Sequence, residues 1–240
     1  MSAAEPLEVQ LDSPEARKNP FPLLHRLREE DPIRYLADQD LWLVTRYQDI
    51  YDLYNDERVT GDRRVWTHYK RPPEGSIFRW IDDYGLMALD RKAHAQQRKL
   101  LGSGFTPRGI ERMDRQIRDV VDRYAKPLQG RRGVVDVMAE FTTPIPNAVI
   151  SAITGVAAAG VSDAEFSRLA QETIQGFFGF VSDEVKERAD RAYVHLSKWV
   201  RDTVVARRDK PEDDLISDLV QAREGAYRFT DDDIVAQVSA

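Results

Sequence analysis

Apolar residues near the amino end of the chain alternate between helical spacing and short apolar runs. Residues 19–30 predict a helix that starts at Asn19-Pro20 and stops before Pro32. The apolar runs 33–36 and 41–45 flank a polar tetrad, which predicts a β-hairpin. Apolar positions at i, i+3, i+4 and i+7 over residues 47–54 then predict a short amphipathic helix.

Periodicity is lost between Asp56 and Asp90. The sequence Arg71-Pro72-Pro73-Glu74-Gly75 breaks any regular element there, so we expect a long loop region over residues 56–90. A loop of this length inside a compact domain is usually functional or mobile.

Beyond residue 106 the pattern is helical almost throughout. One apolar stripe runs along residues 107–124, and a helix over 144–154 starts at prolines and ends at Gly155. Residues 134–137, rich in valine, predict a short strand between these two helices. Further helices are expected over the following ranges: 162–174, 182–204, 211–220 and 230–240.

The last predicted helix starts at a capping box formed by Thr230 and Asp233. It stops inside an apolar run, with no glycine, asparagine or basic residue to cap its carboxyl end. We therefore expect the 240 residues to end within a helix that continues downstream.

Composition narrows the class of protein. With 42% hydrophobic residues, the chain can bury the core of one domain or part of a larger one. The first ten residues contain acids and a proline, and no run of eighteen apolar residues occurs, so we expect a cytoplasmic protein without membrane contact. The absence of cysteine excludes disulfides and thiolate metal sites, and the four histidines lack metal-ligand spacing, so no metal site is expected within the chain.

Charge is unevenly distributed along the chain. The net charge is −6, but residues 91–132 contain twelve Lys and Arg against four Asp and Glu, a local charge of +8. A basic region on an acidic chain predicts an acidic partner. No helix-turn-helix signature accompanies it, so we do not expect nucleic acid. For any single cation, a solvated helix face is the alternative.

One stretch carries candidate chemistry. Asp90 can cap a helix that ends before Thr106-Pro107, and His94 and Arg98 lie four residues apart on it. The two side chains therefore share one face of the helix. A guanidinium fork beside an imidazole donor suits a pair of carboxylates about one helical turn apart.

His94-x-x-x-Arg98, followed by Phe105-Thr106-Pro107, resembles the segment with which cytochrome P-450 haem-thiolate monooxygenases hold the haem propionates. Leu86-Met87-Ala88-Leu89-Asp90 also resembles the soluble bacterial members. The resemblance implies a mainly α fold with a small β-hairpin, the amino-terminal half of the P450 fold truncated at the start of its long central helix. It predicts one incomplete domain over residues 1–240, with these parts: an arm (1–18), a helix-hairpin-helix (19–55), a substrate-side loop region (56–90), the haem-propionate helix (91–103) and a helical part (107–240).

The resemblance also implies an activity. The expected enzyme hydroxylates a small apolar organic substrate with O₂ and with electrons from an acidic ferredoxin- or flavodoxin-like donor, which docks on the basic face around Arg91–Arg132. Its haem b would be oriented by His94 and Arg98, and its axial cysteine is expected downstream of this chain. No catalytic residue is assigned. The residues expected at the substrate are Ile77, Phe78, Leu86, Met87, Phe177 and Phe178, with Trp80 and Ile81 as further candidates.

Two alternatives remain open at the level of sequence. The first alternative is a haem-free P450-like module that recruits partners. The second is an unrelated helical binding domain in which the motif is fortuitous. The former does not explain why one helix carries both His94 and Arg98. The latter predicts a complete, capped terminal helix, which the sequence lacks.

Overall fold

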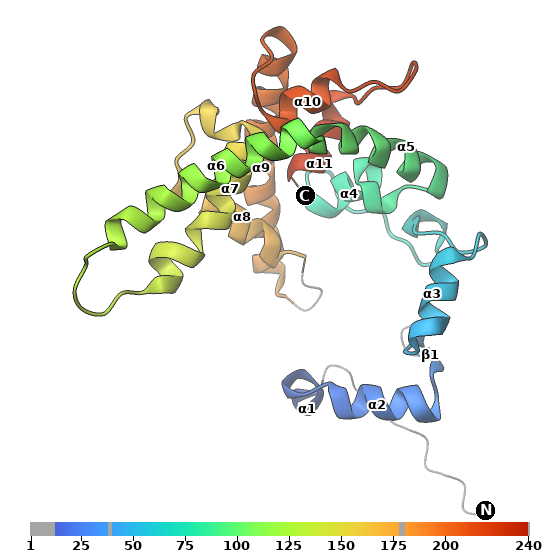
Figure 1. Cartoon of the computed structure of the whole chain (residues 1–240). Coiled ribbons are helices and arrows are strands. Elements are labelled where there is room, and N and C mark those ends of the chain that lie inside the picture. Colours follow the sequence, from blue (N-terminus) through green and yellow to red (C-terminus); the bar gives the residue numbers. More distant parts are fainter. Residues whose placement is uncertain (1–12, 38–39, 178–180, 240) are drawn as a thin grey trace, which may run out of the picture. The chain divides into compact units, whose positions relative to one another are not determined.

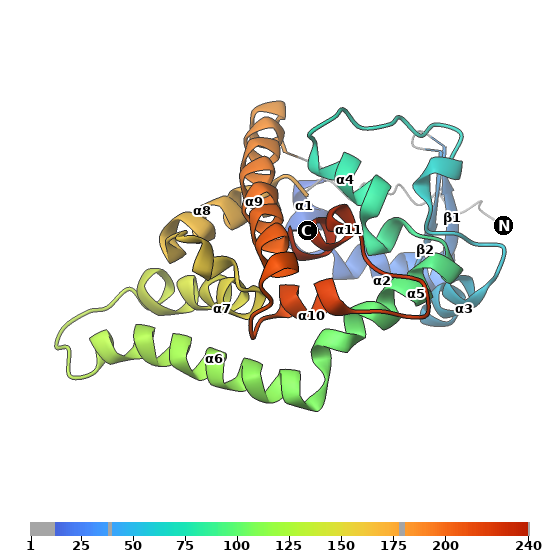
Figure 2. The same ribbon diagram turned by 90° about the horizontal axis from the view of Figure 1, so that it is seen from above.

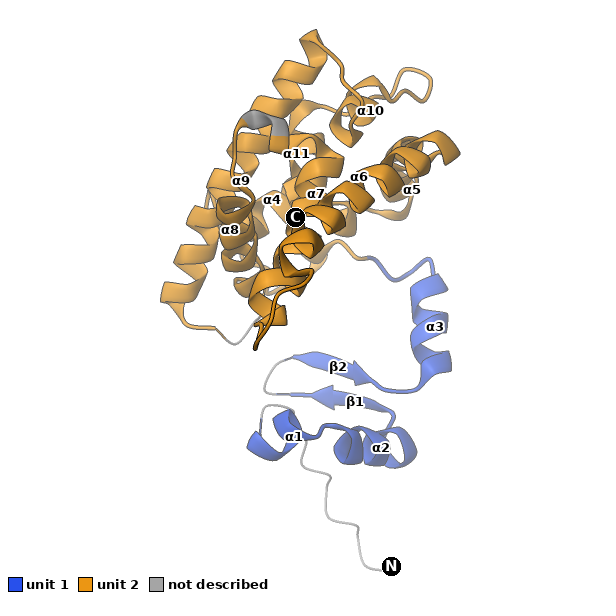
Figure 3. Cartoon of the chain, turned by 60° about the vertical axis from the view of Figure 1, so that its left-hand side comes forward, with its two compact units in different colours: residues 1–60 blue, residues 61–240 orange. Residues whose placement is uncertain are grey.

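The computed structural model describes residues 13–37, 40–177 and 181–239. Figures 1 and 2 show its ribbon in two views. The chain divides into two compact units, residues 1–60 and residues 61–240, which Figure 3 shows in different colours. The single incomplete domain predicted from the sequence stays a prediction, and each unit is described by itself.

Unit 1 has the predicted helix-hairpin-helix order. Its elements are α1 (Pro14–Lys18), α2 (Phe21–Glu30), β1 (Ile33–Leu36), β2 (Leu41–Val44) and α3 (Tyr47–Asn55). The two strands are antiparallel, and Ile33 pairs with Val44 while Leu36 pairs with Leu41. The short helix α1 lies within the predicted arm, where the Ser13 hydroxyl accepts the Ala16 N–H at 3.1 Å and caps it.

Unit 2 is helical in the residues that the structure describes. Its helices are α4 (Ile77–Tyr84), α5 (Arg91–Leu101), α6 (Pro107–Ala125), α7 (Pro144–Thr154), α8 (Asp163–Gln175), α9 (Asp183–Asp209), α10 (Leu215–Gln221) and α11 (Asp231–Ser239). Shorter 3₁₀ turns are η1 (Arg63–Val65), η2 (Leu86–Ala88), η3 (Gly102–Phe105), η4 (Lys126–Leu128) and η6 (Val156–Ala159), and η5 (Met138–Thr142) is a π-helical turn.

The core of unit 2 is built around α9. This 27-residue helix packs against α8, α10 and α11, an arrangement visible in Figure 2. Its buried positions Ala189, Tyr193, Leu196, Val200 and Val204 recur at the spacing that the sequence predicts for one face of a helix. None of the described helices is both long and apolar enough to cross a lipid bilayer.

The expected loop over residues 56–90 is wrong in part, because this region contains α4. The Ser76 hydroxyl accepts the Arg79 N–H at 3.3 Å, and Ile77 and Ile81 are buried on one face of the helix. Eight residues give too little periodicity to outweigh the neighbouring proline-rich segment, and short helices depend on tertiary contacts for their stability.

The predicted strand over residues 134–137 is also wrong. Gly130 and Gly133 adopt positive φ values of 74° and 102° and turn the chain, as expected. The segment that follows has no strand partner among the described residues, and Val134 is 99% exposed. A high β-propensity therefore does not make a strand here, because a strand also needs a neighbour to bond.

Candidate functional site

The helix α5 carries the candidate donor pair in the predicted position. Its start is fixed by Asp90, whose carboxylate accepts the Ala93 N–H at 2.8 Å. His94 is half-buried and Arg98 is exposed one turn further along. Since four residues advance an α-helix by about 6 Å, the two side chains lie above one another on the same face.

Neither His94 nor Arg98 has a side-chain hydrogen bond or ion pair within the described residues. The next cation on the same helix, Lys99, is by contrast paired with Glu224. Two unpaired donors one turn apart match the acceptors of two carboxylates, and the guanidinium can bind one of them through two N–H groups. The donor set therefore fits the two propionate groups of a haem.

A buried polar cluster fixes α5 relative to its neighbours. Gln97 is 5% exposed, and its amide contacts two side chains of α11: its Nε2 donates to Asp233 at 3.4 Å, and its Oε1 accepts from Gln237 Nε2 at 3.2 Å. Gln237 Nε2 also donates to the Tyr84 carbonyl at the end of α4, at 2.9 Å. The orientation of α5 thus depends on residues about 140 positions away, and no local pattern in the sequence points to them.

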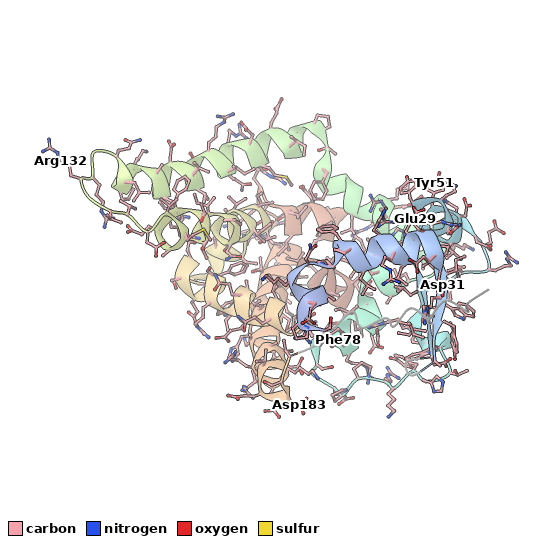
Figure 4. The ribbon with its side chains drawn as sticks, turned by 90° about the horizontal axis from the view of Figure 1, so that it is seen from below. Glu29, Asp31, Tyr51, Phe78, Arg132 and Asp183 are labelled. Atoms are coloured by element: carbon pink, nitrogen blue, oxygen red, sulfur yellow. The ribbon has the colours of Figure 1, made fainter. Side chains whose placement is uncertain are left out.

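A groove of about 590 Å³ lies between the segment 63–82 and the joint of α8 and α9. Its lining is largely apolar and consists of Arg63, Trp66, Tyr69, Lys70, Pro72, Pro73, Ser76, Ile77, Phe78, Asp82, Gly176, Lys186 and Asp190. A smaller cavity of about 210 Å³ is lined by Gly61, Arg63, Phe78, Ile81, Met87, Ala88 and Phe177. Figure 4 labels Phe78, which lines both, and Asp183 at the first turn of α9.

A third cavity of about 480 Å³ is surrounded by the helices of the core. It is lined by Leu101, Phe105, Asn147, Ile150, Thr154, Val156, Phe166, Ala170, Thr173, Ile174, Phe177, Leu196, Val200, Leu215, Leu219, Gln237, Val238 and Ser239. Phe177 borders both this cavity and the small one. His94 and Arg98 line none of these three cavities.

The structure brings together most of the residues expected at the substrate. Phe78 and Phe177 meet edge to face with ring centroids 6.0 Å apart, and the 78%-exposed Met87 lines the small cavity with them. Ile77 is buried and borders the groove. Leu86 is half-buried and lines none of the three cavities, and Phe178 lies outside the described residues.

The two further substrate candidates, Ile81 and Trp80, have different surroundings. Ile81 borders the small cavity beside Phe177. Trp80 belongs to the packing between helices, because its ring centroid lies 5.2 Å from the ring centroid of Tyr84 and 6.4 Å from that of Tyr193.

Charged side chains of α4 hold the groove wall in place. The buried carboxylate of Asp82 accepts from Arg63 and from the Tyr69 hydroxyl, the latter at 2.6 Å, and this bond raises the pKa of Tyr69. Asp83 accepts from Arg79 at 2.6 Å and from Arg71 at 3.2 Å. Partial burial alone would raise the pKa of Asp83, but these two guanidinium groups together hold it below its ordinary value.

Asp190 of α9 is a site residue that sequence reasoning missed. Its carboxylate accepts the Ile77 N–H at 3.0 Å, across 113 residues of sequence. The available signal was weak: Asp190 precedes the buried Tyr193 by three residues, so it places a charge beside the apolar stripe of α9. Asp82 and Asp83 carried a clearer signal, because acids at the carboxyl end of a helix oppose its dipole and need another reason to be there.

The basic region of residues 91–132 is smaller in the structure than in the sequence. Six of its cations form ion pairs: Lys99, Arg112, Arg118, Arg123, Lys126 and Arg131. Within the described residues no side-chain partner is found for Lys92, Arg98, Arg108, Arg115 and Arg132, the last at the far tip of the turn after α6 in Figure 4. The expected basic face thus has fewer unpaired cations than the charge count of the sequence suggests.

The known proteins that this chain resembles are bacterial cytochrome P450s. No family model matches the chain. The polyketide biosynthesis cytochrome P450 PksS of Bacillus subtilis is 28% identical over 233 residues, which cover 93% of this chain and 55% of that protein. The epothilone C/D epoxidase of Sorangium cellulosum is 30% identical over 236 residues, which cover 95% of this chain and 55% of that protein. The solved structure of PksS superposes with a TM-score of 0.74 at 26% identity, covering 96% of this chain and 56% of that one.

Over nearly its whole length, the chain is similar to the amino-terminal part of bacterial cytochrome P450s. It spans about half the length of the curated relatives it matches, and its fold corresponds to the first part of the P450 fold. The predicted fold class, mainly helical with a two-stranded hairpin, is therefore confirmed. An unrelated helical domain with a fortuitous motif is excluded. The P450 relatives imply haem as the cofactor, and His94 and Arg98 remain the residues predicted to orient it.

Proposed function

We propose that this chain is part of a haem-thiolate monooxygenase that hydroxylates a small apolar organic molecule with O₂. One observation carries the proposal: in a P450 chain, His94 and Arg98 share a helix face and have no partner within the described residues. When bound, haem supplies the activation of O₂ at its iron.

The role of this chain toward the haem is binding and orientation. The Arg98 guanidinium offers two parallel N–H donors to one carboxylate, and the His94 imidazole offers a donor to the other. The buried Gln97 amide keeps α5 against α4 and α11, so both donors hold their direction. The 240 residues contain no cysteine, so an axial thiolate has to come from outside them.

The substrate side consists of the groove and the small cavity beside it. The largely apolar surface of their walls favours an apolar molecule. Phe78 and Phe177, in contact with each other, separate the small cavity from its neighbours and so are placed to set its shape. Relatives named as an epoxidase and as a vitamin D(3) 25-hydroxylase support oxidation of an organic substrate.

An acidic ferredoxin- or flavodoxin-like protein remains the proposed electron donor. Three cations support this docking because they have no side-chain partner within the described residues. They are Lys92 on α5 and Arg108 and Arg115 on α6. Exposed charges of this kind affect the rate of association more than its affinity, and their effect decreases with salt.

The experiment measures haem content in a protein that contains this chain together with the thiolate-bearing segment. Arg98→Ala and His94→Ala should each lower haem retention, with Arg98→Ala weakening it about tenfold because a charged, two-point contact is lost. Lys92→Ala is the matched control, since Lys92 is an exposed cation on the same helix but lies off the face of His94 and Arg98.

Haem contents of the Arg98 and His94 variants equal to that of Lys92→Ala would overturn the assignment of the donor pair. A wild-type protein that folds with the thiolate segment present and retains no haem would instead favour the haem-free interaction module.

A further inference from the structure

The groove has two walls of different construction. Ten of its lining residues come from the segment 63–82, and only Gly176, Lys186 and Asp190 come from the side of α8 and α9. The second wall is closely packed, since a Cβ atom on Gly176 would lie 2.5 Å from the Cβ of Ala189 in α9. Because the first wall supplies most of the lining, the way in which it is held has the larger influence on the width of the groove.

The first wall consists of α4 and the strap, which we define as residues 63–73. The strap is bound to α4 by the Arg63 and Tyr69 bonds to Asp82 and by the Arg71 bond to Asp83. Arg79 of α4 also donates to the Pro72 carbonyl at 3.2 Å. These bonds join the strap to α4 at several points along its length.

The carboxyl end of α4 is firmly anchored to the core. The Tyr84 carbonyl accepts from Gln237, which is itself bonded to the buried Gln97. One turn earlier, Trp80 packs against the fully buried ring of Tyr193, and the Arg201 guanidinium lies 5.6 Å from the Trp80 ring centroid. These contacts come from α5, α9 and α11 together.

The amino end of α4 has fewer attachments to the core, and Ser76, Ile77 and Phe78 at this end line the groove. Within the described residues, a single polar bond joins it to α9, from the Ile77 N–H to the Asp190 carboxylate at 3.0 Å. The edge contact between Phe78 and Phe177 accompanies this bond, and the buried Ile77 side chain packs beside it. The bond joins the two walls directly, since Ile77 and Asp190 both line the groove.

We propose that Asp190 holds the groove closed, a role that we call the catch. Its bond to the Ile77 N–H holds the amino end of α4 against α9, and loss of this bond lets α4 and the strap rotate about the anchored Tyr84 end. Asp190 thereby determines the size of molecule that the groove admits. That this molecule is the substrate rests on the proposed function, whereas the catch itself is tested without haem or substrate.

Hydrogen exchange of the chain tests the pivot. In Asp190→Ala the amides of Ile77, Phe78 and Arg79 should exchange at least about tenfold faster than in wild type, because a charge-assisted bond is lost. The Gly85 amide, at the anchored end, should exchange at an unchanged rate. Asp190→Asn keeps an oxygen acceptor at the same place and should give a smaller increase.

Asp202→Asn is the matched control for these variants. Asp202 is an exposed carboxylate on the same helix, paired at 2.6 Å with Lys198 and away from the groove. Amides of α10, such as those of Leu219 and Val220, report whether a variant has lost global stability, since both residues are buried in the core.

A distance measurement across the groove provides a second readout. The chain has no cysteine, so spin labels at Lys70→Cys and Lys186→Cys mark the two walls uniquely. Asp190→Ala should shift the distance distribution to longer values, and Asp202→Asn should leave it unchanged. An unchanged distribution in Asp190→Ala, or equal acceleration of exchange at both ends of α4, would overturn the catch.

Discussion

The helices α4 and α5 are both short and rich in charge, yet they use their charged side chains in opposite ways. In α4, Arg79, Asp82 and Asp83 are all bonded to residues of the strap. In α5, His94 and Arg98 find no partner within the described residues. Paired charges hold a wall in place, whereas unpaired donors on a defined face are free to bind a ligand. The charge count of a helix therefore does not tell which role it has.

The largest effect expected from this comparison concerns Asp82. Asp82→Ala removes a 2%-exposed carboxylate that two side chains of the strap contact. We expect the free energy of unfolding to fall by about 2 kcal/mol, measured by urea denaturation.

Arg98→Ala on the neighbouring helix is the matched control, with an expected change within about 0.5 kcal/mol because no bond is lost. If the two variants were equally stable, the distinction between a structural and a ligand-binding use of charge would be wrong.

A smaller effect is expected at Asp83, and it depends on pH. Its pKa in the folded chain is lowered from 3.8, so its bonds to Arg79 and Arg71 contribute fully above that value and are lost as the pH falls through the lowered pKa. At neutral pH, Asp83→Asn should reduce the free energy of unfolding by about 1 kcal/mol. The difference from wild type should vanish on acidification.

Urea denaturation at a series of pH values between neutral and acidic measures this dependence. Asp202→Asn serves as the control, because Asp202 is an exposed carboxylate paired with Lys198 on α9 and takes no part in holding the strap. A constant difference between wild type and Asp83→Asn at all pH values would show that the carboxylate charge has no part in holding the strap.

The sequence predicted the elements whose information is local. The helix α9 is long, so its apolar stripe repeats over many turns and its buried face could be read directly. The donor pair was predicted for the same reason, since spacing along one helix places His94 and Arg98 on one face. Both belong to elements that start at a side-chain cap, Ser182 for α9 and Asp90 for α5.

What the sequence did not predict depends on distant residues. The helix α4 was missed because its charged residues are bonded to the strap and its first N–H to Asp190, far along the chain. The strand over 134–137 was predicted from valines alone, although no described segment lies beside it. Asp190 was missed because the sequence around a carboxylate on a helix surface does not show whether that carboxylate bonds a distant N–H or is only solvated.

The most direct test of the account compares haem with its dimethyl ester, in which both propionates are neutral. In a protein that contains this chain and the thiolate-bearing segment, wild type should bind haem at least about tenfold more tightly than the ester, because His94 and Arg98 each lose a charged acceptor. The variant that combines His94→Ala with Arg98→Ala should bind both equally. Equal binding of the two by wild type, or a preference that persists in the double variant, would contradict the assignment of these residues to the propionates.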